Sequence, residues 1–267
     1  MDLMIQGIIT AALVVGLVGI FVGLFLGVAG IRFKVQVDEK EEAVLKALPG
    51  NNCGGCGFPG CSGLAAAIAQ GDAAVNACPV GGEPVGKKIA EIMGVEADEK
   101  QHMVAYVRCQ GDCDRAYTDY KYTGAEDCRM MAFVPGGGPK SCNSGCMGYG
   151  TCVKECPFDA IEIKNGVAVV DKDKCKACKK CIAVCPKKLI TLIPYDAKER
   201  VACNSTDKGP VTMKACQVGC IGCGICAKVC PNQAVTVEDF HATIDYEKCV
   251  DCGACMEKCP KGAIVKE

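Results

Sequence analysis

The chain has 267 residues, a formal net charge of −1 and 25 cysteines, but only 2 histidines and no tryptophan. A net charge so close to zero gives no support for a nucleic-acid partner. An odd number of cysteines excludes complete pairing into disulfides, and their frequent spacing at three-residue intervals favours thiolate sites for metal. Because the apolar core is modest for this length, we expect folding to require that metal.

An uncharged, strongly apolar run covers residues 3–31 and exceeds the ~20 residues that a helix needs to cross a bilayer. A cleaved signal peptide would begin with a basic segment and have a shorter apolar stretch, whereas only Asp2 precedes this run. We therefore predict that residues 1–32 form a single transmembrane anchor in contact with lipid. Arg32 and Lys34 follow the run, so the positive-inside rule places the remaining chain on the cytoplasmic side of the cell (inner) membrane.

Three glycines of the predicted anchor, Gly19, Gly23 and Gly27, recur at four-residue intervals and share one face. Small residues at this spacing allow two membrane helices to approach closely. The pattern favours a helix partner for the anchor, although glycine is also common in membrane helices in general.

The segment 33–100 contains the first group of cysteines and is expected to form a small cluster domain. Three of the cysteines fall within nine residues and alternate with glycines, so the backbone can wrap an anionic cluster and direct N–H groups toward its sulfides. An alanine-rich helix over residues 62–69 leads on toward the fourth cysteine. The expected ligands of one [4Fe–4S] cluster are Cys53, Cys56, Cys61 and Cys78. Zinc is the alternative occupant, but zinc sites usually show two separated C-x-x-C pairs.

Three copies of the bacterial ferredoxin motif C-x2-C-x2-C-x3-C-P follow further along the chain. In two-cluster ferredoxins the first three thiolates of a motif bind one cube and the fourth binds the other. The three copies are Cys175, Cys178, Cys181 and Cys185; Cys220, Cys223, Cys226 and Cys230; and Cys249, Cys252, Cys255 and Cys259.

An internal repeat organises this region, because eight cysteines between residues 142 and 185 recur 74 residues later without a gap. Each half also has a strand–turn–strand pattern between its motifs, as at the Asn165-Gly166 turn. We predict two ferredoxin-like modules, at 142–192 and 216–267. A connecting segment at 101–141 precedes them and a linker at 193–215 separates them.

The crossed ligation of ferredoxins predicts four clusters in these modules. Three have complete ligand sets, namely Cys156, Cys175, Cys178 and Cys181; Cys220, Cys223, Cys226 and Cys259; and Cys230, Cys249, Cys252 and Cys255. The fourth lacks a ligand, because Tyr149 stands where the repeat has Cys223. Cys142 is the expected substitute, which gives the set Cys142, Cys146, Cys152 and Cys185. A three-iron cluster is the alternative.

Five cysteines remain, namely Cys109, Cys113, Cys128, Cys203 and Cys216. Four of them could bind a further cluster, which would raise the number of [4Fe–4S] clusters from five to six. The alternative is that some are buried free thiols, which behave as small apolar residues. The pattern does not choose among the five.

The expected fold is α+β: a single N-terminal transmembrane helix, a small mainly helical [4Fe–4S] domain, and two tandem two-cluster bacterial-ferredoxin-like modules. The chain has no nucleophile–base arrangement, no Walker loop and no G-x-G-x-x-G after a strand, so we expect no catalytic residues. Any NAD or flavin chemistry is therefore expected on other subunits.

The order of these parts resembles the B subunit of the Rnf complex over essentially the whole chain. The resemblance rests on the apolar helix, the tandem ferredoxin motifs and the C-G-G-C-G-F-P-G-C module. The segment 48–57 and Cys78-Pro79 are also similar to the small cluster domain of corrinoid iron–sulfur proteins, but this chain has no corrinoid-binding half. The chain carries two ferredoxin modules where shorter Rnf relatives have one, so neither cluster number nor electron route is carried over.

The Rnf resemblance implies that the chain is an electron-transfer subunit of an ion-translocating ferredoxin:NAD⁺ oxidoreductase. The resemblance implies that this subunit receives electrons from soluble reduced ferredoxin. It also implies partner subunits that lie in the membrane or bind NADH and flavin, and a coupling ion that is Na⁺ or H⁺. Two other functions stay open: a polyferredoxin subunit of another membrane redox enzyme, such as a hydrogenase, and a non-redox zinc protein.

A lysine-rich rim around the third cysteine motif could steer an acidic ferredoxin by charge. Its members are Lys172, Lys174, Lys176, Lys179, Lys180, Lys187 and Lys188. The alternative is an ordinary solvated face without a partner.

Overall fold

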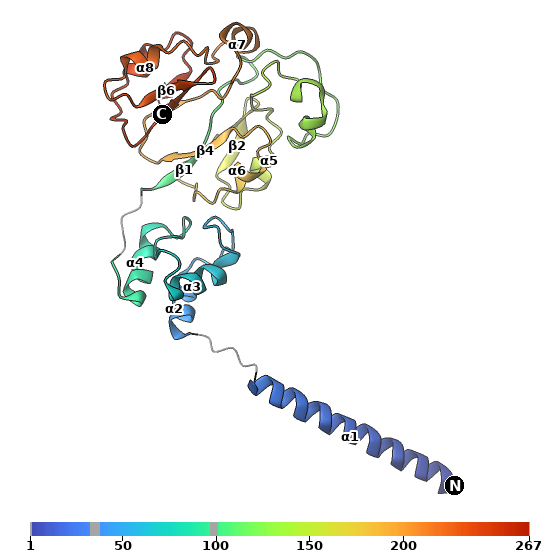
Figure 1. Ribbon diagram of the computed structural model, residues 1–267. Helices are drawn as coiled ribbons and strands as arrows, with labels where there is room; N and C mark the ends of the chain where they lie inside the picture. The colour runs from blue at the N-terminus through green and yellow to red at the C-terminus, as the bar shows by residue number, and fades with distance from the viewer. Residues whose placement is uncertain (1, 33–37, 97–100, 267) are drawn as a thin grey trace.

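The N-terminal helix stands apart from the rest of the chain in the computed structural model, which describes residues 2–32, 38–96 and 101–266 (Figure 1). Helix α1 (Asp2–Arg32) contains the stretch Ala12–Gly30, with a mean hydropathy of 2.7 and none of it buried. Val15 and Phe21 expose 72% and 71% of their surface. By length and composition α1 can cross a membrane, and it is the one such helix in the described part of the chain.

The glycine face of α1 is open. A Cβ atom built on Gly19, Gly23 or Gly27 would meet no atom within 4 Å. The helix partner that this spacing favours therefore stays a prediction. Lys34, one of the two basic residues used to orient the anchor, lies outside the described residues, whereas Arg32 forms part of the last turn of α1.

The cluster domain consists of three helices, α2 (Glu39–Ala47), α3 (Gly60–Gln70) and α4 (Gly82–Met93). Asp38 caps α2 by accepting a hydrogen bond from the backbone N–H of Lys40 at 2.9 Å. The core between the helices is aliphatic, and its most buried members, at 0–1% exposure, are Val44, Leu64, Ala65, Ile68 and Ile89. This packing fixes the cysteine-rich loop 51–59 at the start of α3.

The first ferredoxin-like half is built from two antiparallel strand pairs. Strand β1 (Met103–Val107) pairs with β4 (Ile190–Pro194), and β2 (Ile161–Lys164) forms a hairpin with β3 (Val167–Val170) through the predicted Asn165-Gly166 turn. Its short helices are η1 (Met130–Phe133), η2 (Pro135–Gly137), α5 (Thr151–Lys154) and α6 (Lys180–Val184).

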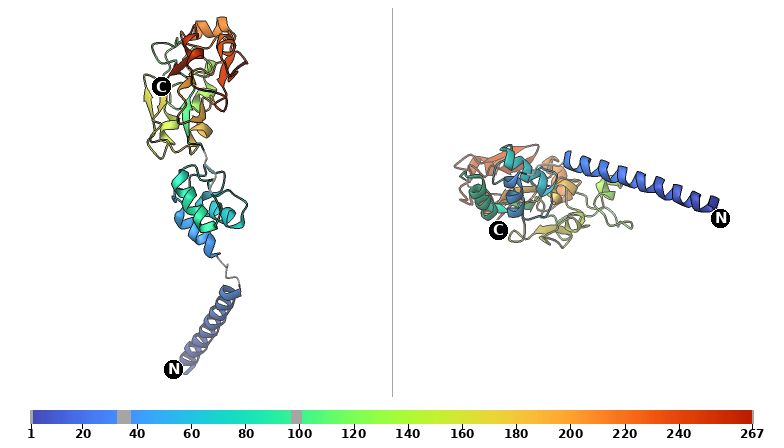
Figure 2. Two further views of the ribbon diagram at one scale, coloured as in Figure 1. Left: turned by 90° about the vertical axis from the view of Figure 1, so that its left-hand side faces the viewer. Right: turned by 90° about the horizontal axis from the view of Figure 1, so that it is seen from below.

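The second half repeats this plan. Strand β5 (Glu199–Val201) pairs with β8 (Ile264–Lys266), and β6 (Val235–Glu238) forms a hairpin with β7 (His241–Ile244). Its helices are α7 (Gly209–Ala215), α8 (Ile225–Val229) and α9 (Ala254–Glu257). Figure 2 shows the two halves packed together at the end of the molecule farthest from α1.

Elements of both halves lie in segments that the cysteine repeat predicts to be outside the two modules. Strand β1 comes from the segment predicted as connecting, and β5 and α7 come from the segment predicted as a linker. Each of these strands pairs with the last strand of its own half, far along the chain. Cysteine spacing carries no information about such a distant partner, which explains the difference.

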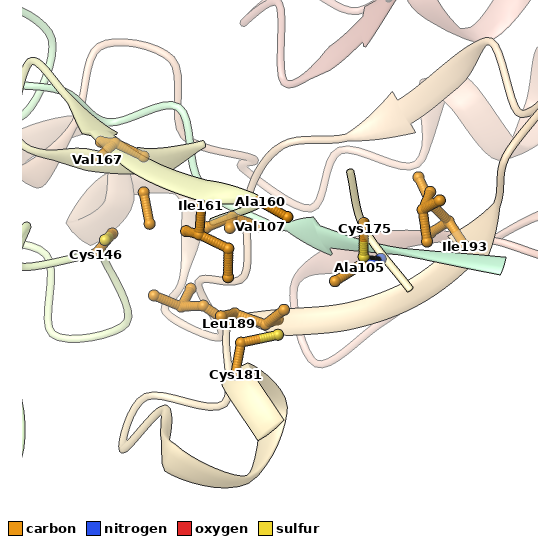
Figure 3. Close-up of a cluster of buried hydrophobic side chains, with 13 residues drawn as sticks. Ala105, Val107, Cys146, Ala160, Ile161, Val167, Cys175, Cys181, Leu189 and Ile193 are labelled. Atoms are coloured by element: carbon orange, nitrogen blue, oxygen red, sulfur yellow. Dashed lines mark hydrogen bonds between the residues drawn. The ribbon is translucent and has the colours of Figure 1, made fainter. Parts of the chain in front are cut away.

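Cysteines form part of the hydrophobic core in the first half. Figure 3 shows Cys146, Cys175 and Cys181 among aliphatic side chains that include Ile161 and Leu189. In the second half, Cys226 and Cys255 lie in a smaller core with few aliphatic neighbours. Metal bound at these thiols would therefore be an internal part of each half rather than a surface addition.

Candidate iron–sulfur cluster sites

The structure gathers the cysteines into six groups of four and leaves Cys113, which is exposed, outside all of them. Each group surrounds its own cavity or loop. The groups use residues from distant parts of the chain, so folding itself brings the thiols together. Four convergent thiols are the donor set of a [4Fe–4S] cluster.

The first group lies in the three-helix domain. Burial raises the pKa of the Cys78 thiol, and Cys61 and Cys53 lie near enough to raise it further. Cys56 packs against the same core. Asn52 shapes the loop, because its side-chain oxygen accepts a hydrogen bond from the backbone N–H of Cys61 at 2.8 Å.

The second group is formed by Cys156, Cys175, Cys178 and Cys181, as the crossed motif predicts. The backbone N–H of Ala105, in β1, donates to Cys175 Sγ at 3.3 Å. Burial raises the pKa of Cys181 to about 12, with further increases from the neighbouring cysteines. A metal cation bound beside Cys181 would offset the cost of burying its thiolate charge.

The third group is formed by Cys128, Cys146, Cys152 and Cys185. Burial raises the pKa of Cys152 to about 12, and Cys146, Cys128 and Cys185 raise it further. Thr151 holds Cys128 in place: its hydroxyl accepts the backbone N–H of Cys128 and donates to Asp127, both at 3.0 Å.

Here the structure differs from the sequence-based expectation for Cys142. Cys128, not Cys142, lines the cavity with Cys146, Cys152 and Cys185. Tyr149 occupies the position of the missing ligand, and its ring packs against that of Tyr122 at 6.0 Å between centroids. Tyr122 and Cys128 both belong to the segment between β1 and Cys142, so this segment supplies a thiol that the repeat lacks. The short sequence separation between Cys142 and Cys146 therefore did not predict which thiol joins this group.

Two more groups lie in the second half and match the predicted sets. They are Cys220, Cys223, Cys226 and Cys259, and Cys230, Cys249, Cys252 and Cys255. Backbone N–H groups again point at sulfur, from Ala263 to Cys259 and from Ala234 to Cys230, each at 3.2 Å. Such donors stabilise the negative charge of a thiolate cluster.

A buried carboxyl group borders the last of these groups. Glu199 is 2% exposed and lies within 4.8 Å of Cys249 and Asp251, measured between potential ligand atoms. Burial raises the pKa of Glu199, and a hydrogen bond and repulsion from Asp251 raise it further. Nothing in the motif spacing indicated Glu199.

The sixth group joins Cys109 and Cys142 from the first half to Cys203 and Cys216 from the second. Burial raises the pKa of Cys142 to about 12, and the other three thiols of the group raise it further by smaller amounts. Three of its members come from the five cysteines that the sequence left unassigned.

Neighbouring groups lie in contact with one another. A Cβ atom on Gly55, in the three-helix domain, would lie 2.9 Å from the carbonyl oxygen of Cys178. Cys152 lies close enough to Cys181 to affect its pKa. In the second half, Cys226 lies in α8 and Cys230 caps the same helix. The first group thus adjoins the second, the second adjoins the third, and the two second-half groups share a helix.

Comparison with known protein families identifies three iron–sulfur regions. Residues 48–80 match the model "Putative Fe-S cluster", residues 168–191 match "4Fe-4S binding domain", and residues 219–263 match "4Fe-4S dicluster domain". The chain therefore carries 4Fe–4S domains of the ferredoxin type, whereas the segment with Cys109, Cys128 and Cys142 lies outside all three matches.

Similar proteins cover most of the chain. It is 45% identical to the B subunit of the Na(+)-translocating ferredoxin:NAD(+) oxidoreductase complex of Acetobacterium woodii, over 92% of this chain and 74% of that one. It is 43% identical to the B subunit of the ion-translocating oxidoreductase complex of Methanosarcina acetivorans, over 86% and 87%. It is 41% identical to the B subunit of the proton-translocating ferredoxin:NAD(+) oxidoreductase complex of Clostridium ljungdahlii, over 89% and 84%. The chain belongs to the family of B subunits of ion-translocating oxidoreductase complexes, the Rnf family.

Proposed function

We propose that this chain is the electron-transfer subunit of an Rnf-type ferredoxin:NAD⁺ oxidoreductase, and that it takes electrons from reduced ferredoxin and passes them along a row of [4Fe–4S] clusters. The observation that carries the proposal is the convergence of thiols into separate groups of four in a member of this Rnf family. The relatives translocate Na⁺ or protons according to their names, so the coupling ion of this chain stays open.

Five of the thiol groups provide the ligands in this proposal. One is Cys53, Cys56, Cys61 and Cys78, and the other four are the Cys128, Cys156, Cys220 and Cys230 groups described above. The backbone N–H groups that point at their sulfurs fit anionic clusters. When bound, the clusters supply one-electron redox chemistry, and the chain fixes their spacing and excludes water.

The proposed arrangement in the cell follows from α1 and its flank. The apolar helix anchors the subunit in lipid, and Arg32 at its end favours a cytoplasmic location for the cluster-bearing body. Other Rnf subunits, in the membrane or carrying NADH and flavin sites, complete the complex. We also propose that the body has two tandem two-cluster modules, bounded by the pairs β1–β4 and β5–β8.

Anaerobic purification of the full chain tests this function. We expect about 20–24 iron atoms and as many acid-labile sulfides per chain, since each [4Fe–4S] cluster contains four of each. Mixing with reduced ferredoxin should reduce the clusters and give EPR signals broadened by interaction between neighbours. Zinc with little sulfide, or intact clusters that reduced ferredoxin fails to reduce, would contradict the proposal.

The lysine-rich rim provides a candidate docking surface for ferredoxin. Lys176, Lys179 and Lys188 are exposed, whereas the Lys187 ammonium donates to the carbonyl oxygen of Asn143 at 2.7 Å. Lys174 is exposed too, but its ammonium lies 3.6 Å from the Asp171 carboxylate. Replacing Lys176, Lys179 and Lys188 by glutamate should slow ferredoxin oxidation about tenfold or more at low salt, with the difference shrinking as salt rises.

Stopped-flow rates across a salt series measure this effect. A matched control replaces Lys208, Lys228 and Lys258, which lie on the second half, by glutamate and changes net charge equally. Equal rates for the wild type and the Lys176, Lys179 and Lys188 variant would refute docking at this rim. Slowing in the control alone would move the docking site to the second half.

A further inference from the structure

We propose that Cys109, Cys142, Cys203 and Cys216 bind a [4Fe–4S] cluster of their own, at the junction between the two ferredoxin-like halves. The inference rests on the proposed function, because it adds a link to the same row of clusters. None of the three family-model matches includes any of these four cysteines, which lie outside residues 48–80, 168–191 and 219–263.

The two halves contribute equivalent ligands. Cys109 follows the end of β1 by two residues, and Cys203 follows the end of β5 by two. Cys142 and Cys216 are related by the 74-residue repeat. Each half therefore supplies one thiol after its first strand and one before its first motif, and the site is complete only when the halves are packed together.

Backbone contacts hold the halves in register around these thiols. Ala116, from the first half, forms an isolated β-bridge with Cys216. The backbone N–H of Tyr117 donates to the carbonyl oxygen of Ala215 at 3.0 Å, and that of Gln217 donates back to the carbonyl oxygen of Arg115 at 2.9 Å. The pairing fixes Cys216 opposite the first half.

Glycines make room at the site. A Cβ atom on Gly111 would lie 3.3 Å from Cys216 Sγ and 3.7 Å from Cys109 Sγ. A Cβ atom on Gly145 would lie 3.4 Å from Cys142 Sγ. Larger residues here would contact the sulfur atoms directly, so the backbone can approach a cluster closely.

The cavity also concentrates positive charge. Lys140 lines it and is 7% exposed, with its ammonium held by the carbonyl oxygens of Gly111 at 2.8 Å and Gly166 at 2.9 Å. Arg108 lines it too, and its buried Nη2 atom has no hydrogen-bond partner among the described residues. A buried guanidinium nitrogen without a partner is costly, whereas an anionic cluster with its sulfides would satisfy it.

The site lies next to one thiol group of each half. The backbone N–H of Cys146, from the third group, donates to Cys109 Sγ at 3.4 Å. On the other side, the backbone N–H groups of Ser205 and Cys220 point at Cys203 Sγ, that of Ser205 at 3.5 Å. A cluster here thus lies between the Cys128 group of the first half, which includes Cys146, and the Cys220 group of the second. It would therefore link the clusters of the first half to those of the second.

Metal analysis of the anaerobically purified full chain tests the sixth cluster. We expect about 24 iron atoms per chain, falling to about 20 in the double variant Cys203→Ala, Cys216→Ala. The variant Cys113→Ala, at the cysteine outside the six groups, is the matched control and should keep the wild-type count. About 20 iron atoms in the wild type, with or without one zinc, would overturn the sixth cluster and leave the proposed function standing. Little iron in every sample would refute both.

A second variant keeps the proposal testable if the double variant does not fold. Arg108→Gln retains all four thiols, so it should keep the wild-type iron count. Loss of the buried positive charge should lower the midpoint potential of one cluster in an EPR-monitored titration and leave the others unchanged. Identical titrations for the wild type and the variant would contradict a cluster beside Arg108.

Discussion

Removal of iron and sulfide is expected to unfold both ferredoxin-like halves while leaving α1 helical. The strands of the halves are 3–5 residues long, and each sheet has only two strands. Isolated two-stranded sheets are marginal in water, and buried thiols form part of each small core. The free energy of unfolding, about 5–15 kcal/mol for ordinary domains, should fall to about zero.

Hydrogen exchange of chelator-treated protein measures this loss. Amides in the pairs β1–β4 and β2–β3 should lose their protection together, because the clusters connect both pairs. The three-helix domain is an internal comparison, since Val44, Leu64, Ile68 and Ile89 give it an aliphatic core of its own. Protected strand amides in protein free of iron would show that the halves fold without metal.

Replacement of Cys128 by alanine is expected to remove one cluster from the first half, a loss of up to about four iron atoms per chain. The reason is its place beside Cys146, Cys152 and Cys185, where Thr151 and Asp127 fix its backbone. A three-iron cluster could persist on the other thiols, so EPR of the oxidised protein should accompany the iron count. The loss should break electron transfer between the Cys156 group and the second half.

The alternative ligand, Cys142, makes this experiment decisive. If Cys142 completed the third group, Cys128→Ala would leave both the iron count and the EPR spectrum unchanged. Cys113→Ala again serves as the control, because Cys113 lies on the same segment but is exposed and outside every group. An unchanged spectrum for Cys128→Ala would overturn the assignment drawn from the structure.

The cysteine motifs by themselves determined much about this protein. Three complete C-x2-C-x2-C-x3-C-P motifs and their repeat predicted the thiol sets of the Cys156, Cys220 and Cys230 groups, and the structure brings each set together. This succeeds because ligands within one motif are close in the chain, and crossed ligation depends only on the hairpin between motifs. Helix α1 was equally predictable from its apolar run, whose length and composition are those of a segment able to cross a membrane.

Only the tertiary structure decided which cysteines outside the motifs come together. Cys128 is 18 residues before Cys146 in the sequence, yet it lines the Cys146 cavity, while Cys142 turns to the other half. The pairing of β1 with β4 and of β5 with β8 carries Cys109 and Cys203 to the junction. Strand pairing between distant segments has no local signature, so spacing could not show which thiols meet. The buried Nη2 atom of Arg108 likewise became visible only once the fold had placed it beside them.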